Sequence, residues 1–207
     1  MTMRADIRFW TAITFIGICG FAITRGWSIV HFSLAMVNIE SSEKRSEIVY
    51  TWNTVPGLAS TALQAELTEQ INPSDQIAAT RRREVLSTLL SIKPLSSMDW
   101  LSLSGMRFMT DQPMEQVLGS LRLSAMTGPN EGYVMAERGI FGASLWEDLS
   151  PDLKRHTAKD LAATERPDDA KFRTVLSTKS ESARDELRTA ILATGLSPKE
   201  VERRLGF

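Results

Sequence analysis

The chain has 207 residues, with 24 Lys and Arg, 25 Asp and Glu, two His and one Cys. A single cysteine excludes both an internal disulfide and a zinc site built from cysteines. A formal net charge of −1 argues against a protein that binds nucleic acid generally. The length suits one modest domain, or a domain with an anchor.

The N-terminal segment 1–39 is apolar and differs from the rest of the chain. Its only charged residues are Arg4, Asp6, Arg8 and Arg25. A membrane-spanning helix needs about 20 largely apolar residues. Residues 7–27 reach that length when Arg8 and Arg25 extend to the two membrane interfaces. We therefore predict a membrane anchor over residues 1–39, with the span at about 7–27. Its anchoring side chains are Trp10, Phe15, Phe21, Arg25 and Trp27.

Two other interpretations of this segment remain open. A cleaved signal peptide also begins with basic residues and an apolar run, but no clean small-x-small cleavage site follows. Cys19 suggests a lipoprotein, yet Ile18 precedes it where a small residue is expected. The segment could also be a buried helix of a soluble protein. We favour an uncleaved signal anchor.

Charges near the span predict its orientation. Arg4, Arg8 and the amino terminus outweigh Asp6 before the span, whereas Arg25 alone lies close behind it. The positive-inside tendency then places the N-terminus in the cytoplasm. We predict a single-pass protein of the inner (cytoplasmic) membrane, with its body in the periplasm or outside.

The rest of the chain shows helix signals in succession and almost no period-two strand pattern. Residues 40–57 are expected to form a juxtamembrane linker that ends at Pro56-Gly57, and residues 58–207 a helical soluble domain. The expected helices lie at about 58–72, 74–92, 96–108, 111–128 (capped by Asp111), 131–149, 151–164, 169–178, 180–194 and 198–206. In 131–149, Gly139, Gly142 and Ala143 are expected to allow close approach of a neighbour. The predicted fold class is all-α: an N-terminal transmembrane helix followed by a helical bundle or a short α-solenoid.

One stretch of this domain resembles a repeat family. The residues that carry the resemblance are Leu101, Gly105, Phe108, Val117, Leu121, Ser124 and Pro129. Their spacing resembles the packing positions of one tetratricopeptide unit, except that Val117 replaces the usual small residue. A shift by one repeat length aligns Gly139 with Gly105 and Met135 with Leu101, and little else. The resemblance covers about residues 101–129; it implies a protein-interaction scaffold and no catalytic residues.

Residues that could carry chemistry are few. His31 and His156 lack a second histidine at ligand spacing, and neither a phosphate-binding loop nor a G-x-S-x-G motif occurs. We expect no metal and no cofactor. The carboxylates near Trp146 offer an alternative function, an envelope hydrolase. These carboxylates are Glu147, Asp148 and Asp152.

Methionines and aromatic residues in the middle of the chain indicate a surface for partners. Methionine suits adaptable binding grooves, although it also fills gaps in a small helical core. The predicted partner-binding residues are Met98, Met106, Met109, Met135, Phe141 and Trp146. We predict a membrane-anchored scaffold with unknown protein partners and no nucleic-acid partner. An accessory role in a cell-envelope or polysaccharide-assembly machine is the expected setting.

Overall fold

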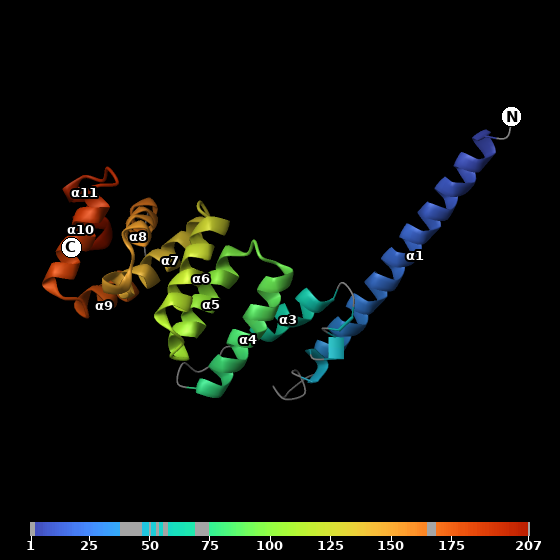
Figure 1. Ribbon diagram of the computed structural model, residues 1–207, viewed down its shortest axis with the longest axis horizontal. Helices are drawn as coiled ribbons and strands as arrows, with labels where there is room; N and C mark the ends of the chain where they lie inside the picture. The colour runs from blue at the N-terminus through green and yellow to red at the C-terminus, as the bar shows by residue number, and fades with distance from the viewer. Residues whose placement is uncertain are drawn as a thin grey trace. The chain divides into compact units, whose positions relative to one another are not determined.

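The computed structural model describes residues 3–37, 47–49, 51–52, 54–55, 58–68, 75–164 and 169–206. Within these ranges the backbone is helical apart from turns and short connections, and it contains no strand (Figure 1). The all-α prediction is therefore confirmed. The chain divides into two compact units, Met1–Gln70 and Ile71–Phe207. The expected linker at 40–57 lies partly outside the described residues, and residues 58–70 belong to the first unit.

The first unit contains the long helix α1, Met3–Val37, and the short helix α3, Ala59–Leu67. The 21-residue segment Ile13–Ser33 of α1 is long enough and apolar enough to cross a membrane. This segment overlaps the predicted span at 7–27. A single apolar N-terminal helix that can span a membrane is thus present among the described residues.

Large apolar side chains along α1 lie on the surface of the first unit. Phe15, Phe21 and Trp27 are all about two-thirds exposed. The side chains of Trp10 and Arg25 lie outside the described residues. Continuous exposure of aromatic and aliphatic groups on this scale marks a surface that meets something other than water.

The C-terminal part of α1 is held by the rest of its unit. Phe32 is buried against Val49 and Ala62, and its ring lies 6.0 Å from that of Trp52 in an edge-to-face contact. These contacts form a small apolar cluster of their own. The packing begins just before the end of the spanning segment at Ser33.

The second unit is a succession of short helices. They are α4 (Gln76–Ile92), α5 (Ser97–Met109), α6 (Met114–Thr127), α7 (Gly132–Ser144), the 3₁₀ helix η1 (Trp146–Asp148), α8 (Pro151–Ala163), α9 (Asp169–Ser177), α10 (Glu181–Leu192) and α11 (Pro198–Leu205).

Serine caps determine where several of these helices begin. A serine side chain accepts a hydrogen bond from a backbone N–H of the first turn, and so satisfies a donor that the helix leaves unpaired. Ser96, Ser150 and Ser180 do this for α5, α8 and α10. Ser197 forms a complete capping box with Glu200 at α11. All four serines stand at or next to the starts that the sequence predicts.

Two local predictions were wrong. Asp111 does not cap α6, because its backbone has a positive φ of 51° and Pro113 occupies the N-cap position. The predicted helix 131–149 is also not continuous. Helix α7 ends at Ser144, and Leu145 leads into the separate turn of η1.

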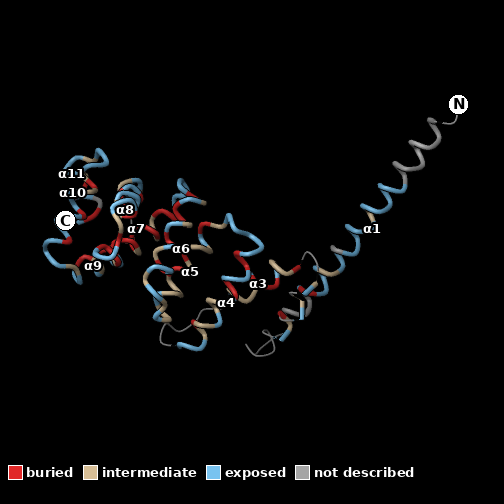
Figure 2. Tube along the Cα trace, viewed as in Figure 1, coloured by how far each residue is buried: buried red, intermediate tan, exposed pale blue. Residues whose placement is uncertain are grey.

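Two pairs of successive helices in the second unit, α5–α6 and α7–α8, pack closely as hairpins. In the α5–α6 pair, Ser104 Oγ donates to the Val117 carbonyl at 2.7 Å. In the α7–α8 pair, the predicted close approach at glycine is confirmed. A Cβ on Gly139 would lie 3.0 Å from Leu161. The inner faces meet in a core that includes Leu121, Trp146, Leu161, Phe172, Leu187 and Ile191. Figure 2 shows buried segments interspersed with exposed ones along the helices of the second unit.

Candidate functional site

The structure separates the six predicted partner-binding residues into three groups by their burial. Trp146 and Met135 belong to the core, with exposed fractions of 1% and 7%. Met98 is exposed at the start of α5. The remaining three, Met106, Met109 and Phe141, are half-buried. Of the six, Phe141 lines a groove on the surface.

An apolar groove lies between α7 and α9, with a volume of about 520 Å³. Its lining includes Glu137, Ile140 and Phe141 from α7, and Lys171, Thr174 and Val175 from α9. Ile140 and Phe141 also belong to the central core or pack against it, as Val175 does. The floor of the groove is therefore fixed by the core, while Thr174 and Lys171 are exposed at its edge.

Two further contacts define the edges of this groove. The ring of Phe141 meets that of Phe108 on α5 edge-to-face, with ring centres 6.2 Å apart. Phe108 is 46% exposed, so the apolar surface continues from the groove onto α5. Lys171 Nζ lies 3.5 Å from Glu137 Oε1, which places one charge of each sign at the edge. Such a groove can hold apolar side chains of a partner between charged flanks.

Sequence reasoning found Phe141 but not the contribution of α9. The sequence of α9 is an ordinary amphipathic pattern, and nothing in it marks Val175 or Thr174. Helix α9, the neighbour of α7 in space, begins only at Asp169, beyond the whole of the intervening α8. The sequence indicated Phe108 as a repeat-packing position and not as part of a site. Its exposed ring contacts that of Phe141.

The buried ring of Trp146 lies beneath an ion pair between Lys154 and the exposed Glu186. Its Nε1 donates to Glu186 Oε2 of α10 at 3.1 Å, and Lys154 Nζ lies 5.2 Å from the centre of the Trp146 ring. Lys154 also donates to both oxygens of Glu186, at 2.8 and 2.9 Å. The hydrogen bonds from Lys154 lower the pKa of Glu186. These contacts connect η1, α8 and α10. The indole ring of Trp146 is buried and has no exposed face for a ligand.

Two of the three carboxylates near Trp146, Glu147 and Asp152, have cationic partners. Glu147 accepts from Lys179 Nζ at 2.8 Å, and this hydrogen bond lowers the pKa of Glu147. Asp152 pairs with Arg155 one turn along α8, and both are exposed. A general acid for glycoside hydrolysis requires a raised pKa, and the shift at Glu147 is in the opposite direction. These contacts therefore give the hydrolase alternative no support.

A buried ion pair is the least expected feature of the second unit. Arg138 of α7 and Asp160 of α8 are 3% and 4% exposed. Arg138 Nε lies 2.6 Å from Asp160 Oδ2, and Nη2 lies 2.9 Å from Oδ1. Arg138 Nη1 donates to the carbonyls of Ser124 and Gly128 at the end of α6. Burial raises the pKa of Asp160, although Arg138 opposes that shift. Three helices are joined at this one guanidinium.

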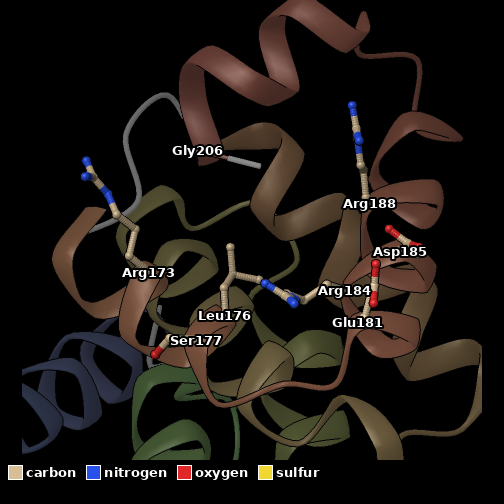
Figure 3. Close-up of a pocket in the computed structure, with 8 residues that line it drawn as sticks. All are labelled: Arg173, Leu176, Ser177, Glu181, Arg184, Asp185, Arg188 and Gly206. Atoms are coloured by element: carbon tan, nitrogen blue, oxygen red, sulfur yellow. The ribbon is translucent and has the colours of Figure 1, made fainter.

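A charged pocket of about 420 Å³ lies against α9, α10 and the end of α11 (Figure 3). Three arginines from α9 and α10, two carboxylates from α10 and the apolar side chain of Leu176 line it. The arginines are Arg173, Arg184 and Arg188, and the carboxylates are Glu181 and Asp185. Sequence reasoning singled out none of these residues.

Among the residues that the structure describes, no group of His, Cys, Asp and Glu is placed to hold a metal ion. Comparison of the chain with protein-family models, with curated proteins and with solved structures finds no match.

Proposed function

We propose that this chain is a single-pass membrane protein whose helical body acts as an interaction scaffold. The anchor is α1, the N-terminus lies in the cytoplasm, and the body lies in the periplasm or outside. An accessory role in a cell-envelope or polysaccharide-assembly machine is the setting we propose. The observation that carries the scaffold function is the groove between α7 and α9, with its apolar floor and charged edge.

The properties of α1 support the anchor. Two of its hydroxyl groups donate within the helix: Thr24 Oγ1 to the Phe21 carbonyl at 3.0 Å, and Ser28 Oγ to the Thr24 carbonyl at 2.9 Å. Polar groups in a bilayer need such internal partners because lipid offers none. An anchor of this kind confines the body near other membrane proteins and raises its effective concentration towards them.

We also propose that the second unit is a short α-solenoid. The pairs α5–α6 and α7–α8 follow one another, α5 packs on α7, and α7 packs on α9, while α10 packs on α8. In such an array each pair contacts its neighbours, and the helices on one side form a continuous surface. Phe108, Phe141 and Val175 lie on the surface formed by α5, α7 and α9, one on each helix.

The proposed occupant of the groove is an amphipathic segment of a second membrane-associated protein. The half-buried Phe141 and Val175 favour an apolar face, and the Glu137–Lys171 pair at the edge favours polar groups flanking that face. A purely charged ligand would leave the floor of the groove unfilled.

Substituting Thr174→Arg should fill the groove from its exposed edge and prevent partner binding. Thr174 is exposed, so the fold is expected to remain intact. Phe141→Asp tests the floor directly. The matched control is Tyr133→Asp, which replaces a 69% exposed aromatic residue of the same helix outside the groove.

Crosslinking in membranes, purification of the chain and quantitative mass spectrometry measure the recovered partner. We expect both groove variants to reduce recovery by about tenfold, the effect of removing one central anchor from an interface. Tyr133→Asp should leave recovery unchanged. Equal recovery from all variants, with helix content preserved, would refute the proposed function.

A further inference from the structure

The charged pocket at α9 and α10 carries a second inference, independent of the apolar groove. Arg184 and Arg188 stand one turn apart on α10, and Glu181 and Asp185 stand one turn apart on the same helix. Among the described residues, neither Arg184 nor Arg188 forms an ion pair, although both carboxylates line the same pocket. Their guanidinium donors therefore remain available to a ligand.

Figure 3 shows how these side chains are arranged. Arg184 extends towards Leu176, while the carboxylates of Glu181 and Asp185 lie close to each other on one side. Arg173 and Arg188 lie on opposite sides of the view. Leu176 is only 7% exposed and provides a fixed apolar patch between the charged walls.

These groups specify the chemistry of a ligand. A guanidinium pairs with a carboxylate or phosphate through two parallel hydrogen bonds. An ionised carboxylate accepts hydrogen bonds only, so Glu181 and Asp185 require donors such as hydroxyl groups. A volume of about 420 Å³ falls in the usual range for small-ligand sites. The ligand must combine an anionic group, several hydroxyls and a compact apolar face.

We propose that this pocket binds an acidic sugar unit of an anionic saccharide. Arg184 and Arg188 bind its acid group, Glu181 and Asp185 accept hydrogen bonds from its hydroxyls, and Leu176 contacts the C–H face of the ring. An acidic peptide fits less well, because it lacks hydroxyl donors at each unit for Glu181 and Asp185. A neutral sugar leaves the arginines without a partner.

The test uses the full chain in detergent or lipid nanodiscs, titrated with trigalacturonic acid as the probe. Maltotriose, a neutral trisaccharide, and triglutamate, an acidic peptide, are the competing ligands. We expect trigalacturonic acid to bind at least about tenfold more tightly than either. Arg184→Gln with Arg188→Gln should weaken its binding by about tenfold, the usual scale for lost charge-assisted hydrogen bonds. Arg155→Gln, an exposed arginine outside the pocket, is the control and should have no effect.

A second variant separates recognition of hydroxyls from simple attraction of charge. Glu181→Gln with Asp185→Asn removes two negative charges while keeping similar shapes. The proposal predicts weaker binding of trigalacturonic acid, because charged acceptors are lost. Tighter binding in this variant, equal binding of triglutamate, or no response to the arginine substitutions would overturn the proposal.

Discussion

Replacing Arg138 by methionine should lower the free energy of unfolding of the second unit by about 3–5 kcal/mol, the usual cost of leaving one member of a buried ion pair alone. Asp160 would then remain buried without its cation, and the carbonyls of Ser124 and Gly128 would lose their donor. Urea denaturation followed by circular dichroism in detergent measures the change. Arg155→Met, at an exposed pair, should cost less than about 1 kcal/mol.

A paired substitution distinguishes loss of the ion pair from loss of packing. Arg138→Met with Asp160→Leu removes both charges and keeps apolar volume in the site. Because such replacements are often neutral or stabilising, the double variant should recover much of the stability that Arg138→Met loses. A double variant that is less stable than the single one would contradict this expectation and show that the pair contributes more than charge compensation.

Substituting Gly142→Ala should destabilise the second unit, although alanine is the better helix former. A Cβ at Gly142 would lie 2.9 Å from Cγ2 and 3.1 Å from Cβ of Thr157, which is 3% exposed. Thr157 is β-branched and buried, so it has little freedom to move away. Overpacking of this kind typically costs about 1–3 kcal/mol. The measurement is the urea midpoint of the variant against that of the parent chain.

Gly119→Ala provides the control for this substitution. Gly119 is also inside a helix, α6, but a Cβ there would meet no atom within 4 Å. Alanine should therefore stabilise that helix by up to about 1 kcal/mol. Adding Thr157→Ala to Gly142→Ala should restore part of the lost stability. If Gly142→Ala behaves like Gly119→Ala, helices α7 and α8 are not in the close contact described.

The helical segments of the second unit were predictable because their ends are locally encoded. Ser96, Ser150, Ser180 and Ser197 are caps, and each accepts its hydrogen bond from the first turn of its own helix. The N-cap of α6 was not predictable, because the chain reverses after α5 through backbone hydrogen bonds. The N–H groups of Asp111 and Gln112 donate to carbonyls in the last turn of α5, which leaves the N-cap position of α6 to Pro113.

The candidate sites were harder to predict because they depend on packing between segments distant in sequence. Phe141 was named for its type alone, while its neighbours Phe108 and Val175 come from two other helices. Trp146 was predicted as a partner-binding residue, yet its ring lies in the core. Arg138 did leave a local signal: it is a single cation in the apolar, glycine-containing helix segment VMAERGIFGAS.

The most direct test of the scaffold account is photocrosslinking from within the groove in native membranes. A photoreactive amino acid at Thr174 lies at the groove edge, and one at Thr189, exposed on α10, lies outside it. The account predicts a discrete adduct with an amphipathic segment of one membrane-associated protein from position 174, and none from position 189. Adducts of equal yield from both positions, or none from position 174, would contradict it.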